Sequence, residues 1–558
     1  MESLSGRARS IAGSIVEAMA ATPPRENEPI AVIGAGPGGL AAAMLLAASG
    51  ARVRVYEAQP SVGGRTSRVT LGGATGDFHF DLGPTFFLMP YVLDEIFQAA
   101  GRRLADTIEL TRLDPMYRLL LGRPGEDPIM LDATQDVAEM ARRIGDIDAK
   151  DGAAFQRFIA DNRAKLHAAE PILRRAIRSP IDLLKPDAVR ALPHINPHKS
   201  VHELLSKYFD HPQVRLAVSF QSKYLGMSPF DCPSLFTILP FIEYEYGVWH
   251  ATGGLNRIMH AMAVACEDMG VEILTGSPVE TLTFEGKRAT GVIVNGKHHV
   301  HADVVVNADA PWALKNLLPA DALRRVSGYA SADAIDAKKY SCSTSMLYLG
   351  IDGQTDLPHH TIYVSSRYEQ NLEEISRLGT LSEDPSAYVC NPVTTDPSMA
   401  PPGCSALYVL MPTPNVRSTV DFKAERGRMR RDMLDQLERV FGIEDVEDRI
   451  QCEKMIAADD WAAMNINHGA TFNLAHNLGQ MLHKRPRHEL QGLEGVWMVG
   501  GGTHPGSGLP VIFLSSQITS RMLCERRALS YAGTHSSGLP SAEIADRAAM
   551  PDAQPATA

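Results

Sequence analysis

Three glycines and one carboxylate near the start of the chain have the spacing of a dinucleotide-binding turn. The glycines are Gly34, Gly36 and Gly39, and Glu57 follows at the end of the next apolar segment. In such a turn the first glycine permits the sharp bend, the second admits a pyrophosphate, and the third lets a helix pack against the sheet. The helix N-terminus then faces the phosphates, and Glu57 can accept hydrogen bonds from both ribose hydroxyls. These residues predict a site for an adenine dinucleotide without a 2′-phosphate.

A second glycine-rich turn, Gly63-Gly64-Arg65, follows shortly after Glu57. A simple NAD-binding unit does not need this turn. Two glycines, including Gly64, and the fork-shaped guanidinium of Arg65 suit a second approach to the same pyrophosphate. The combination favours FAD over NAD, whereas the alternative interpretation is an ordinary surface turn.

Near its C-terminal end the chain has another glycine-rich turn, Gly500 to Pro510, between an apolar strand and a helix. A helix N-terminus there would stabilise the negative charge that a reduced flavin carries near N1 and its C2 carbonyl by about 0.3–2 kcal/mol. Glycines that serve packing alone are the alternative. His504 in this turn could donate a proton, although a turn histidine more often bonds to the backbone.

Two further carboxylates, Glu243 and Glu245, lie in an aromatic run between Phe241 and Trp249. Carboxylates among apolar walls can have a raised pKa and perform acid–base work, which makes both candidate catalytic groups. Ion pairing at the surface is the simpler alternative. No metal site is expected, since Pro197 interrupts the histidine-rich segment around it.

Short apolar segments must position these turns. Ile30–Ile33 and Val53–Tyr56 predict two strands around a helix at Leu40–Ala48. Residues 253–309 and 495–525 each contain further strand, turn and helix patterns. Because the three stretches share the same order of elements, we predict that they assemble into one discontinuous domain.

The predicted fold class is therefore α/β, with a discontinuous Rossmann-like FAD-binding domain and an inserted α+β substrate-binding and membrane-binding part. The FAD-binding domain is assigned to residues 29–100, 225–320 and 480–530, a helical insertion to 101–224, and a substrate-binding domain to 321–479. Residues 1–28 are interpreted as an extension and 531–558 as a disordered tail, since both lack apolar periodicity. Basic and apolar residues interleave between Arg163 and Arg190, which is typical of a membrane-surface element or of an ordinary solvated helix face.

The overall composition excludes several classes of protein. The 558 residues include 54 Lys and Arg against 65 Asp and Glu, and this net charge of −11 argues against a nucleic-acid partner. Seven cysteines without a CxxC pair argue against a disulfide framework and favour the reducing cytoplasm. No run approaches the ~20 apolar residues of a membrane-spanning helix.

These motifs together resemble the bacterial phytoene desaturases of the carotenoid pathway, including the diapophytoene desaturases, within the amine-oxidase-like flavoproteins. The resemblance extends over about residues 29–527. Its strings are Ala31–Leu40, Gly63–Arg65, Phe80–Thr85, Gly247–Gly254, Tyr340–Ser343, Ala406–Pro414 and Gly501–Pro510. The replacement of the usual Ile-Pro-Gly-Val string by Leu509-Pro510-Val-Ile leaves the subfamily and the product open.

The resemblance implies a GR2-type FAD domain and desaturation of a long polyene, with hydride passing to the flavin and a proton to a base or water. It implies peripheral attachment to the inner membrane from the cytoplasmic side. The electron acceptor stays open, with oxygen and a quinone as the two candidates. The residues that it places around the ADP half are Gly34, Gly36, Gly39, Glu57, Gly64, Arg65 and Val279. Those that it places around the flavin are Gly502, Thr503, His504, Pro505, Gly506 and Gly508.

Physical chemistry agrees with a polyene substrate, because a C30 or C40 hydrocarbon must be held by shape and apolar walls. Three alternatives stay open. The first is a carotenoid oxygenase or late-stage (hydroxy)carotenoid desaturase on the same scaffold, and the second is a flavin amine oxidase. The third is a non-catalytic FAD-binding escort protein, which would not need the intact turn at Gly501–Pro510.

Overall fold

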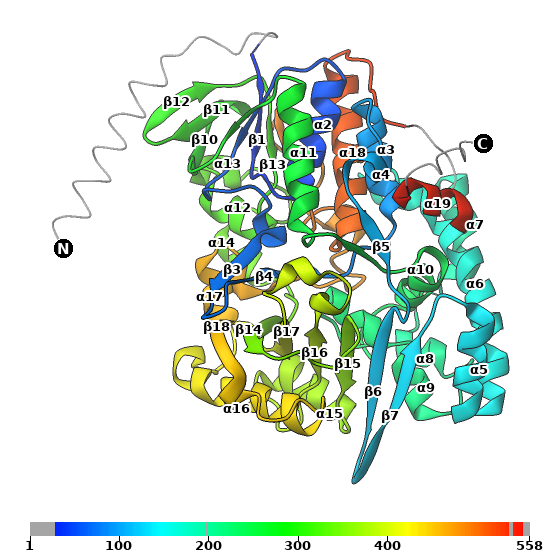
Figure 1. The fold of residues 1–558 in the computed structure, drawn as a ribbon. Coiled ribbons are helices and arrows are strands. Elements are labelled where there is room, and N and C mark those ends of the chain that lie inside the picture. The colour runs from blue at the N-terminus through cyan, green and yellow to red at the C-terminus, as the bar shows by residue number, and fades with distance from the viewer. Residues whose placement is uncertain (1–27, 197, 535–539, 551–558) are drawn as a thin grey trace, which may run out of the picture.

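The computed structural model describes residues 28–196, 198–534 and 540–550 (Figure 1). A small parallel sheet lies in the upper part of Figure 1 and a large mixed sheet in the lower part, with a group of helices along one side. The proposed extension over residues 1–28 lies outside the described residues, except for Glu28. In the described part of the chain, no helix combines the length and apolar character needed to cross a bilayer.

The parallel sheet has the strand order β19-β13-β1-β2-β9, so its strands come from three distant parts of the sequence. Every strand is short, and the four strands other than the edge strand β9 are almost wholly buried, which is typical of parallel sheets covered on both faces. This arrangement confirms the predicted α/β class with a discontinuous Rossmann-like domain. The strands are β1 (Ile30–Ile33), β2 (Val53–Tyr56), β9 (Glu272–Leu274), β13 (Val304–Val306) and β19 (Val496–Met498).

Alternate strand residues face two different cores. Val32 and Val55 point to the side covered by helices, whereas Ile33 and Val304 point to the side covered by a three-stranded sheet. The helices are α2 (Pro37–Ala48), α11 (Asn256–Asp268) and α18 (Leu509–Arg526), and Figure 1 shows them side by side. The opposite cover consists of β10 (Val279–Glu285), β11 (Arg288–Val294) and β12 (Lys297–Val300), followed by α12 (Ala310–Asn316), α13 (Ala320–Leu323) and α14 (Ala332–Asp336).

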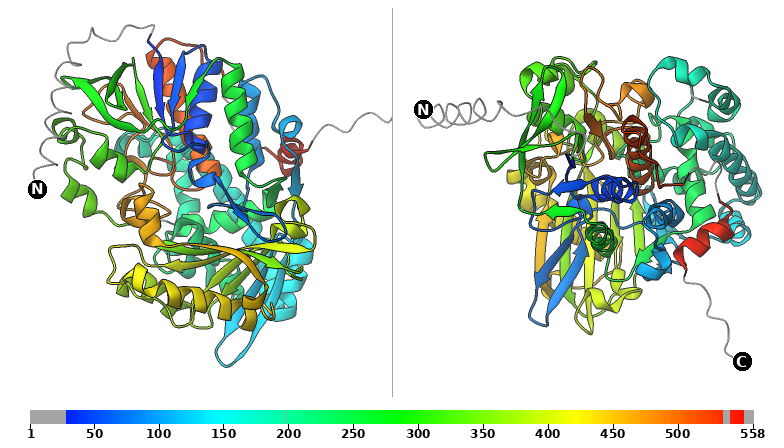
Figure 2. Two further views of the ribbon diagram at one scale, coloured as in Figure 1. Left: turned by 60° about the vertical axis from the view of Figure 1, so that its left-hand side comes forward. Right: turned by 90° about the horizontal axis from the view of Figure 1, so that it is seen from above.

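The large sheet has the order β18-β14-β17-β16-β15-β6-β7. On β14, Leu347 and Leu349 face helix α16, while Met346 and Tyr348 face the hairpin β3-β4. The left view of Figure 2 shows α16 on the sheet face that points away from the parallel sheet. The elements are β14 (Ser343–Asp352), β15 (His360–Val364), β16 (Ala387–Cys390), β17 (Cys404–Thr413), β18 (Ile450–Ile456), β6 (Tyr117–Arg123), β7 (Glu126–Ala133), β3 (Arg68–Gly72), β4 (Asp77–Asp81), α15 (Tyr368–Glu373), α16 (Phe422–Arg439) and α17 (Ala458–Ala463).

The helical group forms the remaining side of the molecule, and it differs from the prediction for residues 101–224. That segment also contains β6 and β7, which complete the large sheet. The apolar run Leu119–Leu121 is buried on both faces of β6, so its pattern cannot distinguish a strand from a core helix. The other elements of this group are α3 (Pro90–Ala99), α4 (Leu104–Thr107), β5 (Leu110–Arg112), α5 (Val137–Ile147), α6 (Ala149–Leu173), α7 (Pro186–Ile195), α8 (Val201–Leu205), α9 (Pro212–Ala217), α10 (Ile238–Tyr246) and β8 (Trp249–Ala251).

Part of the predicted disordered tail is a helix, α19 (Ala542–Ala549), which packs against α3, α4 and α10. Ala545 and Ala549 are buried there, and Asp546 pairs with Arg112. The prediction of disorder is wrong for this helix, because three small alanines on one face suffice to pack closely and give little apolar signal.

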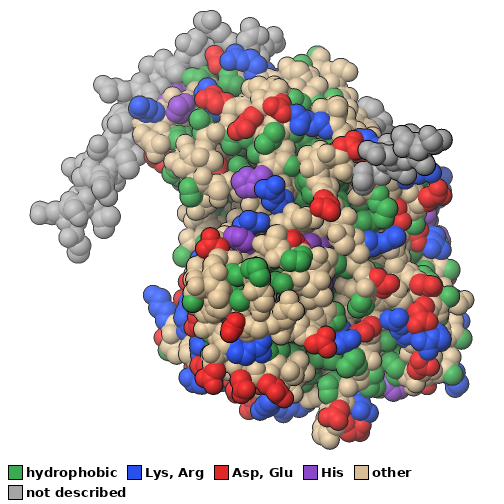
Figure 3. Space-filling view, viewed as in Figure 1, with side chains coloured by type: hydrophobic (Ala, Val, Ile, Leu, Met, Phe, Trp, Pro, Cys, Tyr) green, Lys and Arg blue, Asp and Glu red, His purple; other side chains and the backbone are tan. Residues whose placement is uncertain are grey.

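On the face shown in Figure 3, acidic and basic side chains lie interspersed.

Candidate active site

A cavity of about 850 Å³ extends from the glycine-rich turns of the parallel sheet to the large sheet. The volume is within the usual range for small-molecule sites. At one end it is lined by backbone from the turns after β1, β2 and β19. Farther along, its walls include the apolar side chains of Phe86, Leu88, Leu239, Ile242, Met346 and Leu410. The cavity therefore has a polar, glycine-rich end and an apolar interior.

The glycine turn after β1 passes directly over Asn307, which ends β13. A Cβ atom on Gly34 would lie 2.2 Å from the Asn307 carbonyl oxygen, and one on Gly36 would lie 3.1 Å from its side-chain Nδ2. A Cβ on Gly39 would lie 2.0 Å from the Gly34 carbonyl oxygen, where α2 crosses the turn. Gly34 and Gly36 line the cavity, whereas Gly39 serves the packing of the helix on the strand. Asn307 was not predicted, because only the pairing of β1 with β13 brings it here.

Glu57 follows β2, and its carboxylate is buried at the cavity wall. It accepts hydrogen bonds from the backbone N–H groups of Ala35 at 2.7 Å and Gln59 at 2.8 Å. These bonds hold the carboxylate beside the glycine turn with lone pairs still available for further donors. Val279, at the start of β10, lines the same end of the cavity.

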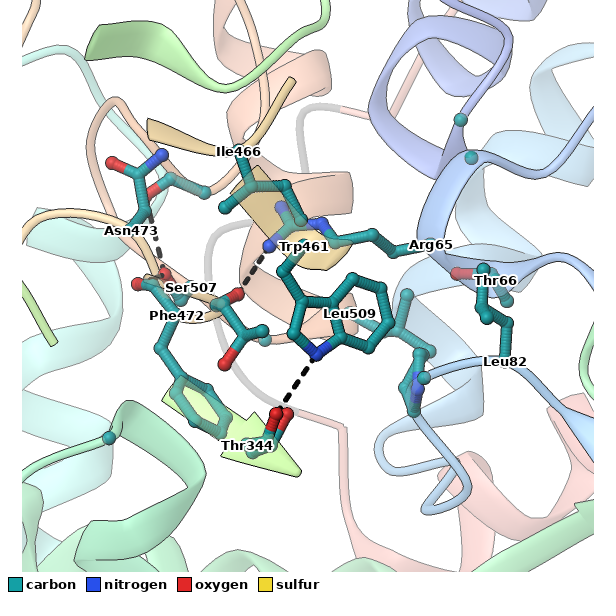
Figure 4. A pocket seen from close by; sticks show the side chains of 18 of the residues that line it. Arg65, Thr66, Leu82, Thr344, Trp461, Ile466, Phe472, Asn473, Ser507 and Leu509 are labelled. Atoms are coloured by element: carbon teal, nitrogen blue, oxygen red, sulfur yellow. Dashed lines mark hydrogen bonds between the residues drawn. The ribbon is translucent and has the colours of Figure 1, made fainter. Parts of the chain in front are cut away.

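Arg65 extends from the Gly63-Gly64 turn towards the turn of the C-terminal segment. Its guanidinium donates a hydrogen bond to the carbonyl of Thr471 and lies near Asp309 (Figure 4). Burial raises the pKa of Asp309 to about 6, although Arg65 acts to lower it. Asp309 caps α12 and accepts a hydrogen bond from Asn473 Nδ2 at 2.5 Å. The guanidinium of Arg65 is thus positioned by groups from two distant parts of the chain, Asp309 and residues 471–473.

The C-terminal turn contributes fewer cavity residues than the resemblance implies. Gly502 and Gly508 line the cavity, and Gly508 begins α18 with a φ of +117°. Thr503, Pro505 and Gly506 are absent from its lining. The Thr503 hydroxyl instead donates to the Pro486 carbonyl at 2.5 Å, and a Cβ on Gly506 would lie 2.5 Å from His476 Nε2. These three residues therefore support the turn from outside the cavity.

His504, the candidate proton donor, also lies outside the cavity lining. Its ring is buried, and Nε2 donates to the Ile172 carbonyl at the end of α6, 2.9 Å away. Burial lowers the pKa of His504 to about 4, so the ring is neutral near pH 7. The side chain joins the turn to the helical group and matches the backbone-bonded alternative.

The two candidate carboxylates have different surroundings, and neither lines the cavity. Glu243 is fully buried and accepts hydrogen bonds from Tyr117 at 2.9 Å and Gln221 at 3.1 Å. Burial raises the pKa of Glu243 to about 7. Glu245 forms a part-exposed ion pair with Arg163, 2.6 Å apart.

Several cavity residues carry no motif in the sequence. The Tyr388 hydroxyl bonds to Thr85 at 2.7 Å and to His360 Nδ1 at 2.8 Å, and Phe86 stacks on the His360 ring. Lys223 also lines the cavity, and Trp461 closes the wall near Thr344, to whose carbonyl its indole N–H donates (Figure 4). Behind Tyr388, the potential ligand atoms of His359, His360 and Cys390 lie within 4.8 Å of one another. The sequence predicts no metal site, and only the pairing of β15 with β16 assembles this cluster.

The polar end of the cavity fits an FAD nucleotide. Gly34 and Gly36 line this end with bare backbone, since a Cβ atom at either position would lie against Asn307, and α2 begins at this turn. Arg65 and the buried carboxylate of Glu57 line the cavity, together with the buried carboxylate of Asp309 beside Arg65. The guanidinium of Arg65 suits a pyrophosphate, and the carboxylate of Glu57 suits a ribose.

Comparisons with known proteins agree with this reading. The family model described as "Flavin containing amine oxidoreductase" matches residues 37–521. A 4,4′-diapophytoene desaturase (4,4′-diapolycopene-forming) from Methylomonas sp is 40% identical over 517 residues, which cover 92% of this chain and 99% of the relative. An all-trans-zeta-carotene desaturase from Myxococcus xanthus is 37% identical, with 88% of this chain and 93% of the relative covered.

Solved structures support the fold. An oxidoreductase from Methanosarcina mazei superimposes with a TM-score of 0.59 at 16% identity, covering 89% of this chain and all of that one. Cyclohexylamine oxidase from Brevibacterium oxydans gives a TM-score of 0.55 at 14% identity, covering 90% and 99%. By its family match and its relatives, the chain belongs to the carotenoid desaturases within the flavin containing amine oxidoreductase family.

Proposed function

We propose that this protein is an FAD-dependent desaturase that introduces double bonds into phytoene or diapophytoene in carotenoid biosynthesis. The observation that supports the proposal is that one cavity contains both a glycine-rich end suited to a nucleotide and an apolar interior. Its relatives include diapophytoene and zeta-carotene desaturases at 40% and 37% identity.

The residues of the chain have three tasks in such a reaction. Gly34, Gly36 and Gly64 would admit the pyrophosphate, with Arg65 as its counter-charge and Glu57 on the ribose. The apolar side chains would align an extended polyene by shape, because a hydrocarbon offers no hydrogen-bonding group. When bound, FAD supplies a two-electron acceptor for hydride. Oxygen or a quinone would then take up these electrons.

The product test uses cells that accumulate colourless phytoene or diapophytoene. Expression of this protein should convert one of them to a coloured polyene, identified by its absorption spectrum and by mass. The lack of any coloured product from both would contradict the proposal. A new product from a preformed carotenoid alone would identify a late-stage desaturase or oxygenase, and peroxide release from simple amines would identify an amine oxidase.

The substrate also requires access from a lipid phase, and one exposed patch suits that role. Ile181, Leu184, Val189 and Leu192 are 73%, 73%, 47% and 55% exposed, on the 3-10 turn Pro180–Leu184 and on α7. We define these four side chains as the apolar patch. Lys185 lies between its two halves. The proposed location is the cytoplasmic surface of the inner membrane, with the apolar patch in the interface.

A further inference from the structure

Two lysines line the cavity, Lys223 and Lys454, and of these Lys454 is exposed to solvent. Lys223 lies on the 3-10 turn Phe220–Leu225, and its side chain lines the cavity. Its Nζ lies 4.8 Å from the centre of the Tyr368 ring. No residue in the described ranges 28–196, 198–534 and 540–550 forms a hydrogen bond or ion pair with this Nζ under normal geometric limits.

The groups around Lys223 are neutral. Burial lowers the pKa of Lys223 to about 7, so the neutral amine is accessible near neutral pH. Burial also raises the pKa of the Cys342 thiol to about 12 and raises that of the phenols of Tyr368 and Tyr224. These groups come from the segment before β14, from α15 and from the same turn as Lys223, and none of them supplies a counter-charge near pH 7.

A buried lysine, Lys165, shows what a structural amine looks like in this protein. Lys165 on α6 donates hydrogen bonds to the Thr237 hydroxyl at 2.6 Å and to the Ser234 carbonyl at 3.5 Å. It does not line the cavity. The amine of Lys223, by contrast, lies at the cavity wall against the Tyr368 ring, where it can reach a ligand in the cavity.

The turn that carries Lys223 connects to the C-terminal glycine turn through Gly226. A Cβ on Gly226, three residues on, would lie 2.5 Å from the Phe472 ring. The Phe472 carbonyl in turn accepts a hydrogen bond from the Ser507 hydroxyl at 2.8 Å, and Figure 4 shows these two residues together at the cavity. Lys223, Phe472 and Ser507 all line the same cavity.

We propose that Lys223 is the base that takes up the proton released in each desaturation step. The proposal rests on the proposed function. One carbon of the polyene loses hydrogen with its electron pair to the flavin, and the neighbouring carbon loses a proton to the lone pair of Nζ. The electron pair of that second C–H bond forms the new double bond. The resulting ammonium returns its proton to water before the next step.

The first test compares Lys223→Met with Lys165→Met, which removes a buried amine outside the cavity. Lys223→Met should keep its bound flavin and lose at least about hundredfold in kcat, within the range for a general base. Lys165→Met should keep kcat. In the wild type, kcat should rise about tenfold per pH unit up to about pH 7 and then level off, because only the neutral amine accepts a proton. Lys223→Arg should be as slow as Lys223→Met, since a guanidinium stays protonated.

A second measurement does not depend on turnover. Cyanate reacts with neutral amines, so the flavin-loaded protein should carbamylate at Lys223 about tenfold faster than at surface lysines near pH 7, as read by peptide mass spectrometry. Methylamine should restore turnover to Lys223→Ala, which covers a failure of the Met variant to fold. Wild-type kcat and pH dependence in Lys223→Met, or a slow reaction with cyanate, would overturn the proposal. Inactivity of the wild type on both hydrocarbons would instead refute the proposed function.

Discussion

At the scale of single residues, Gly36 offers the sharpest test of the cofactor site. A valine there would place its Cβ 3.1 Å from Asn307 Nδ2 and its methyl groups in the path of the pyrophosphate. We expect Gly36→Val to purify without flavin, as measured by its visible absorbance.

The matched control for that variant is Gly427→Val on α16. A Cβ at Gly427 meets only the end of Arg431, 3.6 Å away, and the position is remote from the cavity. This variant should stay yellow. Flavin retained in Gly36→Val would contradict the placement of the pyrophosphate over this turn.

The buried carboxyl of Glu243 predicts a pH dependence of stability. Its folded-state pKa of about 7 lies above the ordinary value of 4.5, so the folded protein binds the extra proton more tightly than the unfolded chain. The associated stabilisation is complete below pH 4.5, is lost as the pH rises through 7, and amounts to about 3 kcal/mol. Glu243→Gln should therefore gain stability relative to the wild type at pH 8 but not at pH 5, as measured by thermal unfolding.

Glu245→Gln, two residues away, serves as the control. Its ion pair with Arg163 is part-exposed, and such pairs contribute little. The difference between pH 5 and pH 8 should remain as in the wild type. An equal response of both variants would show that the charge of Glu243 is not held in the protein interior.

The residues that the sequence predicts best are those whose role is fixed by the backbone. The glycines at Gly34, Gly36 and Gly64 belong to local turns, so their spacing is visible in one short stretch. Asn307, Asp309 and Lys223 could not be found in this way, because they reach the site only through pairing between distant segments. The partner of His504 could not be found for the same reason, because Ile172 lies on the distant helix α6.

At the scale of elements, the apolar patch on the Pro180–Leu184 turn and α7 predicts binding to lipid. Transfer of a leucine side chain from water to an apolar phase contributes about 1.5–3 kcal/mol. The double variant Leu184→Asp, Leu192→Asp should bind liposomes at least about tenfold more weakly in a flotation assay. Met130→Asp, a change at a 59% exposed apolar side chain on β7, should not. Equal loss in both would contradict a specific membrane face.

The sequence pattern predicts only some of the helices and strands. The parallel strands are correctly predicted from their short apolar runs, and glycine-rich turns mark the helices that follow β1 and β19. β6 and β7 were missed, because β6 has apolar side chains on both faces and lies far in sequence from its partner β15. α19 was missed because alanine packs well but carries little apolar signal.

For the whole molecule, the cofactor should act as part of the fold. The cavity lies between the two sheets, so a ligand that bridges them stabilises only the folded chain. Removal of FAD should lower the unfolding temperature, and its return at a hundred times Kd should add back about 3 kcal/mol. NAD at the same concentration should have no effect. Identical unfolding of the two forms would contradict an FAD site between the sheets.

The strand order β19-β13-β1-β2-β9 has a consequence for biosynthesis. The first glycine turn leaves the ribosome early, whereas β19 and the turn at Gly500–Gly508 are made last, on the order of tens of seconds later. The nascent chain therefore carries an incomplete cradle throughout translation. The supply of FAD in the cell can therefore affect this protein only after the chain is released from the ribosome. A truncated chain that ends before β19 would not bind flavin and would stay colourless.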